Sequence, residues 1–263
     1  AQTLYLLPIG IFGMAIAASE LPELSRKRED VQAFLVPRVR WALTRMAFLL
    51  IPSALAYLVL GDVFVAALFQ RGAFLADTTM ATSAVLAAYS LGLPASASSR
   101  ALTSAFYALR DTRTPASIAT GRVVLSLVVG VSLMFPLDRL TIGTMHLGAV
   151  GLALGSAVGA WTEYALLRRR LGSHLGPHGP IKGRVPRLVL SGIVAAGAGF
   201  GAKLLLGFSS NPGWISEWLK EDSIWHNPLA AVGTAGVFGV VYLGMTALLG
   251  VGMPLRRTSS PDI

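Results

Sequence analysis

Residues Ala105–Pro115, AFYALRDTRTP, join two long apolar segments and decide how those segments fold. Phe106 and Tyr107 are aromatic side chains of the kind that gather where hydrocarbon meets water. Arg110 and Arg113 are typical of the cytoplasmic side of a membrane. The stretch therefore predicts a turn at a membrane surface, where one helix ends and another begins.

The last residues of this stretch contain the expected start of the second helix. We predict Thr114 as the N-cap, because its hydroxyl can accept a hydrogen bond from an unpaired backbone N–H group. Pro115 is then the first helical residue, a position where its missing N–H costs nothing. With Arg110, Asp111 and Arg113, these residues are interpreted as a structural motif that positions the helix.

The composition predicts an integral membrane protein. Of the 263 residues, 54% are hydrophobic and only 13% are charged, whereas a soluble domain has about 25% charged residues. The mean hydropathy is +0.63. The net charge is +9, which in a soluble protein would favour nucleic-acid binding, but the placement of the charges favours a membrane topology instead. There is no cysteine, so disulfides and thiolate metal sites are excluded.

Seven apolar segments are each close to the roughly 20 residues that span a bilayer as a helix. We predict an all-α membrane protein with about seven transmembrane helices. The segments are Leu4–Ala18, Ala42–Leu60, Thr78–Ala97, Pro115–Phe135, Leu147–Leu167, Val185–Phe208 and Leu229–Met253.

The basic residues between these segments predict the orientation of the chain. Seventeen of them follow the first, third and fifth segments or lie in the tail, among them Arg40, Arg100 and Arg168, and only three lie in the other loops. Positively charged loops stay on the cytoplasmic side. The N-terminus is therefore expected outside and the C-terminus in the cytoplasm, with no concentrated nucleic-acid site.

Two ionisable residues lie within expected spans and are candidates for a role in transport. Arg122 is about two turns inside the fourth segment, where an unpaired charge facing lipid is costly. It either faces an internal aqueous cavity that binds an anionic substrate or extends toward the cytoplasmic headgroups. Glu163 lies near the inner end of the fifth segment and is either a proton or cation site or part of an ion pair.

The sequence shows no chemistry typical of an enzyme. His174 and His178 have a spacing found in metal sites, but they lie in a Gly/Pro-rich loop without convincing further ligands. Phosphate-binding and dinucleotide-binding glycine motifs are absent. No catalytic residue, metal or cofactor is therefore predicted.

Three stretches, in this order and spacing, resemble the MurJ/MviN family of lipid II flippases, within the superfamily of multidrug and oligosaccharidyl-lipid exporters. They are AQTLYLLPIGIFGMAIAASELPELSR at residues 1–26, LFQRGAF at Leu68–Phe74, which contains Arg71 and Gly72, and ALRDTRTP at Ala108–Pro115. The resemblance implies a bacterial inner-membrane protein of fourteen helices, in two lobes plus two extra C-terminal helices. This chain would correspond to the C-terminal half: residues 1–183 as the C-terminal lobe and 184–263 as the extra pair, which would form a groove for a lipid tail.

The resemblance also implies a function and its partners. Such proteins move lipid II, a diphosphate-linked peptidoglycan precursor, from the inner to the outer leaflet by alternating access. The chain would then act with a missing N-terminal lobe and with membrane lipids, and would be inactive alone. Many relatives carry an arginine at the position of Thr3, and Arg122 is expected to replace that cation. A related exporter of another polyprenyl-linked glycan or a drug, or a non-transporting membrane scaffold, is the alternative.

Overall fold

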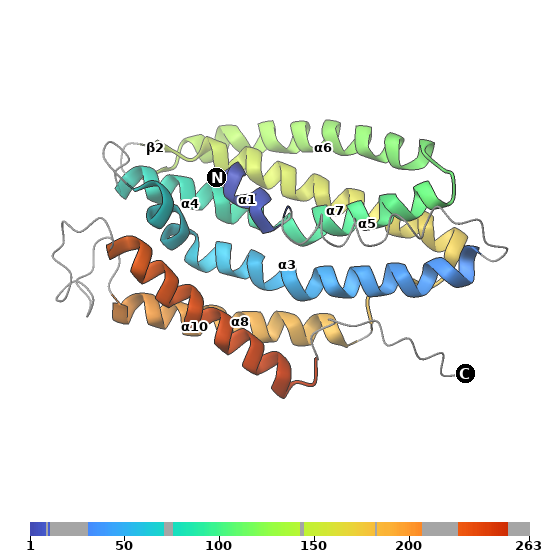
Figure 1. Cartoon of the computed structure of the whole chain (residues 1–263). Coiled ribbons are helices and arrows are strands. Elements are labelled where there is room, and N and C mark those ends of the chain that lie inside the picture. Colours follow the sequence, from blue (N-terminus) through green and yellow to red (C-terminus); the bar gives the residue numbers. More distant parts are fainter. Residues whose placement is uncertain are drawn as a thin grey trace.

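The computed structural model describes residues 1–8, 10, 31–70, 76–142, 145–181, 183–206 and 226–251 as a bundle of long helices (Figure 1). The only strands in this described part are the short antiparallel pair β1 (Thr141–Ile142) and β2 (Met145–His146). The helices are α1 (Gln2–Pro8), α3 (Val31–Phe69), α4 (Ala76–Ser90), α5 (Leu93–Ala108), α6 (Arg113–Asp138), α7 (Gly148–Leu175), α8 (Arg184–Leu206) and α10 (His226–Leu248).

The expected all-α membrane architecture is confirmed. Five helices in the described part are long and apolar enough to cross a membrane, and the bent pair α4–α5 could form a sixth span. Much of α6 is exposed along its length, with Val123 and Leu127 each more than 60% exposed, as suits a helix in an apolar solvent. Most of the first predicted segment lies outside the described residues, as do Arg71 and Gly72.

Helix α3 extends well beyond the predicted segment Ala42–Leu60. It has 39 residues, or about 58 Å at 1.5 Å per residue, which is longer than the roughly 30 Å hydrocarbon core. Its first turns contain Arg40, which was expected in a loop but is helical. The helix bends at Leu60, whose backbone angles (φ −115°, ψ 16°) are not helical. Apolarity alone did not reveal these ends, because a helix can continue past the membrane.

The third predicted segment is two helices, not one. Helices α4 and α5 meet at a break after Ser90 and are bent by 40° relative to each other. Pro94 stands in the first turn of α5, where it lacks an N–H to continue the preceding helix. Gly92 lies so close to α7 that a Cβ there would be 2.9 Å from the Ala157 Cα. The bend therefore follows from a proline and a close helix contact.

The helices α6 and α7 pack closely along a glycine stripe. A Cβ on Gly151 would lie 2.6 Å from the backbone of Leu133 and Met134, and a Cβ on Gly155 would collide with the backbone of Gly130. Small residues permit this approach of two helix backbones in a membrane. The stripe thus fixes α7 against α6, and with it the height of Glu163 relative to Arg122.

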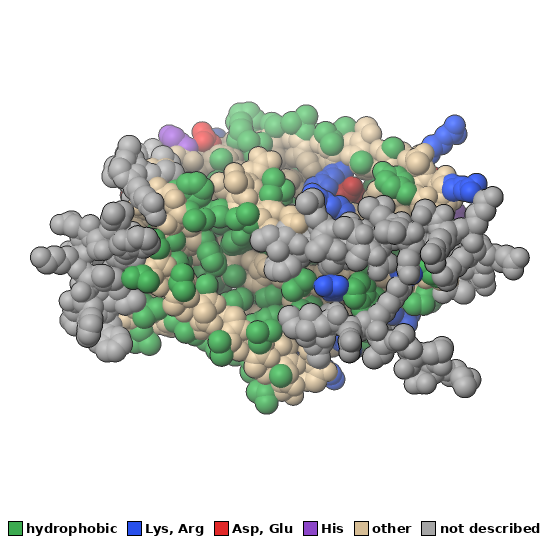
Figure 2. Space-filling model, in the orientation of Figure 1, with side chains coloured by type: hydrophobic (Ala, Val, Ile, Leu, Met, Phe, Trp, Pro, Cys, Tyr) green, Lys and Arg blue, Asp and Glu red, His purple; other side chains and the backbone are tan. Residues whose placement is uncertain are grey.

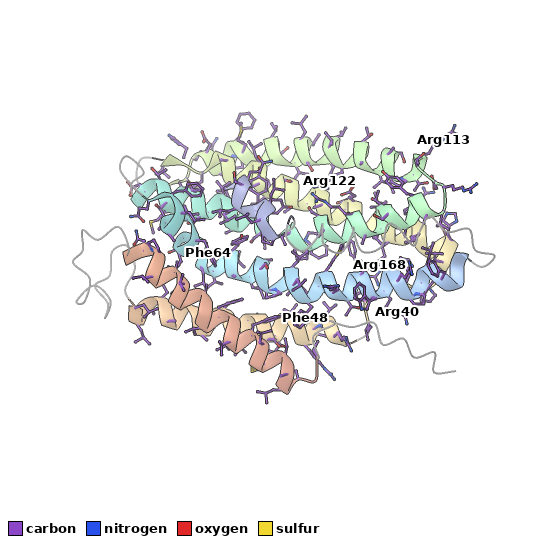
Figure 3. The ribbon with its side chains drawn as sticks, in the orientation of Figure 1. Arg40, Phe48, Phe64, Arg113, Arg122 and Arg168 are labelled. Atoms are coloured by element: carbon purple, nitrogen blue, oxygen red, sulfur yellow. The ribbon has the colours of Figure 1, made fainter. Side chains whose placement is uncertain are left out.

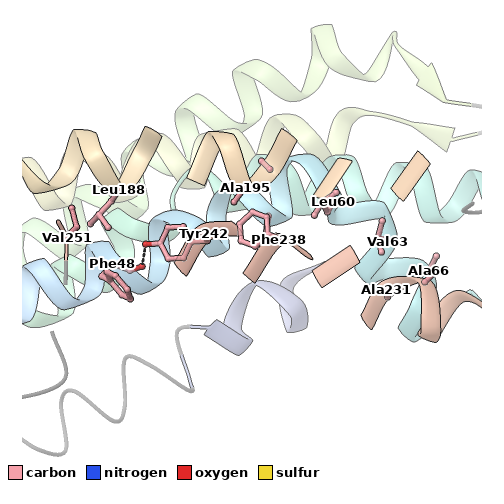
Figure 4. Packing of buried hydrophobic residues seen from close by; sticks show 13 residues of the cluster. Phe48, Leu60, Val63, Ala66, Leu188, Ala195, Ala231, Phe238, Tyr242 and Val251 are labelled. Carbon is pink, nitrogen blue, oxygen red and sulfur yellow. Dashed lines mark hydrogen bonds between the residues drawn. The ribbon is translucent and has the colours of Figure 1, made fainter. Parts of the chain in front are cut away.

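Helices α8 and α10 pack on the side of α3 away from α6 and α7 (Figure 1). Buried side chains from the three helices form one core there, with Phe238 stacked on Tyr242 and the Tyr242 hydroxyl donating to the Phe48 carbonyl at 2.6 Å (Figure 4). Lys203 of α8 forms an ion pair with Asp62 of α3. Helix α3 therefore lies between the pair α8 and α10 on one side and the rest of the bundle on the other.

The turn at Ala105–Pro115 joins α5 to α6 as expected, but its capping residue differs. The Asp111 and Arg110 N–H groups donate to the carbonyls of Phe106 and Tyr107, both at 3.0 Å, and Arg110 has a positive φ of 61°. This is the Schellman ending of a helix, with Arg110 at the position that glycine usually occupies.

The prediction that Thr114 is the N-cap was wrong. Helix α6 already begins at Arg113, and the backbone N–H of Thr114 donates to the Asp111 carboxylate at 3.0 Å. A carboxylate is a stronger acceptor than a hydroxyl, so Asp111 caps the helix. Pro115 is the third helical residue, where an N–H would still have no partner within the helix.

Candidate functional site

The two ionisable residues singled out within the spans lie against each other. Arg122 Nη1 of α6 and Glu163 Oε2 of α7 are 2.5 Å apart. The side chains are 29% and 10% exposed, respectively. Figure 3 places Arg122 far from the ends of the bundle. The arginine therefore does not extend to the headgroups; it forms an internal ion pair, which lowers the cost of a charge at membrane depth.

A small polar network surrounds this pair. Arg122 Nη2 lies 3.5 Å from Ser96 Oγ, and the Tyr5 hydroxyl donates to the same oxygen at 3.0 Å. These contacts join α1, α5 and α6 at one point. Ser96 is buried, so the network holds Nη2 of the guanidinium while Glu163 holds Nη1.

The pair and its network line a cavity of about 400 Å³. Its charged lining residues are Arg100, Arg122 and Glu163, so the cavity carries a net positive charge. Ser99 also lines it, and the buried Ser99 Oγ has no hydrogen-bond partner in the described part of the chain. Figure 2 shows basic side chains around an acidic one in a hollow of this mainly apolar face.

Sequence reasoning missed Arg100 and the serines of α5. Arg100 was assigned to a loop, but it lies in the middle of α5 and faces the cavity. The signal was present in the sequence: Ser96, Ser99, Arg100 and Thr103 are spaced by three and four residues and so share one helix face. All four line the cavity.

The remaining site residues lie elsewhere. Thr3 is exposed on α1 and does not line the cavity, although its neighbour Gln2 does. Arg110 and Arg113 are exposed at the α5–α6 turn. Among the described residues, no group of three or more His, Asp or Glu side chains could hold a metal ion.

Comparisons with known proteins agree on one family. The family model described as "Lipid II flippase MurJ" matches residues 1–216. A protein of Rhizobium meliloti named "Probable lipid II flippase MurJ" is 36% identical over 75% of this chain and 36% of its own length. A protein of Vibrio cholerae with the same name is 30% identical over 93% of this chain and 43% of its own length.

A solved structure shares the fold. The structure named "Lipid II flippase MurJ, inward closed conformation" aligns with 93% of this chain and 44% of its own, with a TM-score of 0.65 and 21% identity. The chain thus spans less than half the length of these relatives. On the family model and the sequence relatives, the chain belongs to the lipid II flippase MurJ family and is a multi-pass protein of the bacterial inner membrane.

Proposed function

We propose that this chain forms the C-terminal part of a flippase that moves lipid II from the inner to the outer leaflet by alternating access. The observation that carries the proposal is the basic, polar cavity around Arg122. A diphosphate cannot cross about 30 Å of hydrocarbon without a polar path. Arg122 and Arg100 offer planar guanidinium groups, which can donate two parallel hydrogen bonds to a phosphate.

In this mechanism Glu163 binds Arg122 until the substrate diphosphate takes its position. While the cavity is empty, the carboxylate neutralises Arg122 at 2.5 Å and so reduces the cost of burying the charge. An arriving diphosphate competes with Glu163 for the guanidinium. The displaced carboxylate then takes up a proton or a cation, or contacts the hydroxyl of Ser99, which also lines the cavity. The exchange couples substrate binding to a change in the contact between α6 and α7.

The remaining parts of the flippase follow from the same proposal. Residues 1–183 form the C-terminal lobe and face an N-terminal lobe that supplies further cations. Residues 184–263, with α8 and α10, form the groove for the lipid tail. The end of the bundle that carries the α5–α6 turn lies at the cytoplasmic leaflet, where its arginines contact anionic lipids.

Transport by the full-length protein tests the role of Arg122. We expect Arg122→Ala to lower transport about tenfold to a hundredfold, since a hydrogen bond to a charged group contributes about 1.5–3 kcal/mol. Arg122→Lys should retain part of the activity, because lysine keeps the charge but not the planar fork. The assay is lipid II translocation in vesicles, with protein levels measured in parallel.

The ion pair of Lys203 and Asp62 provides a matched control. It also joins two membrane helices, but neither residue lines the cavity. Lys203→Ala should therefore lower transport much less than Arg122→Ala does. Full activity of both Arg122 variants would exclude a substrate role.

A second experiment tests whether a cation at position 3 can replace Arg122. Thr3→Arg in the Arg122→Ala background should then restore transport. If transport is not restored, the two positions do not share one role.

A further inference from the structure

A second basic cavity lies on the opposite side of α7 from the Arg122 site. It has a volume of about 850 Å³ and is bounded by α3, α7 and the segment 176–181 that follows α7. Trp161 lines this cavity, whereas Glu163 lines the first one. Residues two apart on a helix point in nearly opposite directions. The two cavities are therefore separated by the body of α7.

Three arginines line this cavity without an acidic partner among its lining residues. They are Arg40 of α3 and Arg168 and Arg169 of α7, and Figure 3 shows Arg40 and Arg168 close together near one end of the bundle. Arg40 donates to the Pro177 carbonyl at 3.3 Å, and Arg168 donates to the Tyr164 hydroxyl at 3.5 Å. A guanidinium has five N–H donors, so these single bonds leave donors for a phosphate.

One wall of the cavity, next to the arginines, is built from the segment after α7. The Arg168 guanidinium lies directly against Gly179, where a Cβ would overlap with its Nη2. The Ile181 N–H donates to Thr44 Oγ1 at 3.3 Å, which fixes the segment on α3. The cavity is therefore shaped by specific contacts between sequence positions far apart.

His178 adds a buried polar atom to this wall. The residue is 3% exposed, and its Nδ1 donates to the Gly176 carbonyl at 2.7 Å. Its Nε2 is buried and has no hydrogen-bond partner in the described part of the chain. The bond from Nδ1 holds the imidazole ring within this wall.

The basic cavity continues into an apolar one. A neighbouring cavity of about 620 Å³ shares Trp161, Ala165 and Arg169 with it and extends along α7 to Leu154. From Arg169 to Leu154 is about 22 Å along a helix. The Trp161 indole N–H donates to the Leu91 carbonyl at 2.9 Å, which holds the ring where the two cavities meet.

We propose that these two cavities together form a binding site for an anionic glycerophospholipid. Arg40, Arg168 and Arg169 bind the phosphate headgroup, and an acyl chain lies in the apolar cavity along α7. Free phosphate would use only the basic part. A zwitterionic lipid would place an ammonium group among arginines. Basic pockets between transmembrane helices are suited to anionic headgroups.

Lipid binding to the purified protein tests the site directly. Native mass spectrometry compares dioleoylphosphatidylglycerol with dioleoylphosphatidylcholine. We expect the wild-type protein to retain the anionic lipid preferentially, and the double variant Arg168→Gln/Arg169→Gln to bind it about thirtyfold more weakly, at about fivefold per basic residue. Arg139→Gln removes an exposed arginine at the C-terminal end of α6, outside both cavities, and should leave binding unchanged.

Further variants distinguish the lipid from other ligands. Arg168→Lys/Arg169→Lys keeps both charges and should keep most of the binding, which separates lost charge from a disturbed fold. Ala165→Phe narrows the junction of the cavities and should weaken lipid binding but not binding of inorganic phosphate. Equal binding of both lipids, wild-type affinity in the glutamine variant, or displacement of phosphatidylglycerol by undecaprenyl diphosphate would overturn the proposal. The readout is independent of transport.

Discussion

The start of α6 depends on one partly buried carboxylate. Asp111 accepts a hydrogen bond from the Thr114 backbone N–H at 3.0 Å. Hydrogen bonds from the Thr114 side chain and backbone hold the pKa of Asp111 below its ordinary value of 3.8. A carboxylate at a helix N-terminus is also stabilised by the helix dipole. Because α6 carries Arg122, this cap helps to set the depth of that charge.

We expect Asp111→Ala to lower the thermal stability of the protein at neutral pH. The pKa of Asp111 is lower in the folded state, so its contribution is present above the ordinary value of 3.8 and is lost as the pH falls through the folded-state pKa. The difference in melting temperature between wild type and Asp111→Ala should therefore shrink below pH 4. Asp111→Asn keeps an acceptor without the charge and should lie between the two. A difference that persists unchanged at low pH would contradict the cap.

Single residues in the candidate site could be named from the sequence, but their partners could not. Arg122 and Glu163 stand out as charges in apolar segments, yet they are 41 positions apart. Their contact depends on how α6 packs on α7. Arg100 was assigned to a loop because it follows the third apolar segment and was counted with the basic loop residues. The spacing of its polar neighbours indicates a helix face instead. Asp111 was included in the structural motif, but its capping role was missed, since Thr-Pro is the stronger sequence signal for a helix start.

At the scale of the helix, the α6–α7 contact is the element most sensitive to side-chain size. A Cβ on Gly155 would meet the Gly130 backbone and would lie 2.7 Å from the Ser126 carbonyl oxygen. The backbone atoms of a helix cannot move aside as a flexible side chain can. Any larger residue must therefore separate the two helices and lengthen the distance between Arg122 and Glu163.

We expect Gly155→Ala to destabilise the protein by about 1–3 kcal/mol, the usual cost of overpacking. Gly121→Ala on α6 is the matched control, because a Cβ there would have no atom within 4 Å. It should be neutral or slightly stabilising, since alanine favours a helix more than glycine does. Thermal unfolding of both variants in detergent measures the difference. Equal midpoints for the two would show that the interface is looser than its geometry indicates.

Helix boundaries were harder to predict than the presence of helices. Apolar windows located the segments, because only buried or lipid-facing helices tolerate so few charges. They gave no information on the polar turns that extend α3 beyond the membrane. The break between α4 and α5 is encoded by Gly92 and Pro94, but a proline within an apolar run is also tolerated in membrane helices. Only the close contact with Ala157 makes the bend necessary.

The described helix ends and turns gather at two opposite ends of the bundle. Helix α3 begins, α7 ends and the α5–α6 turn lies at one end, whereas α3 ends, α4 begins and the strands β1 and β2 lie at the other (Figure 1). Loop charge alone predicts such an alternation, because the prediction depends on the side to which each loop belongs and not on the residues at which a helix ends. Which end faces the cytoplasm stays a prediction. Packing, by contrast, depends on shape, which a hydropathy profile does not contain.

The chain contains no cysteine, so single cysteines can report the orientation of these ends without background. Thr112 is exposed in the α5–α6 turn and makes no capping hydrogen bond with its side chain. Leu140 is 56% exposed next to the hairpin at the other end. An excess of arginine keeps a loop in the cytoplasm. A membrane-impermeant maleimide added to intact spheroplasts should therefore label Leu140→Cys, and Thr112→Cys only after permeabilisation. The reverse pattern would place the basic end outside and would exclude the proposed direction of lipid II movement through the Arg122 cavity.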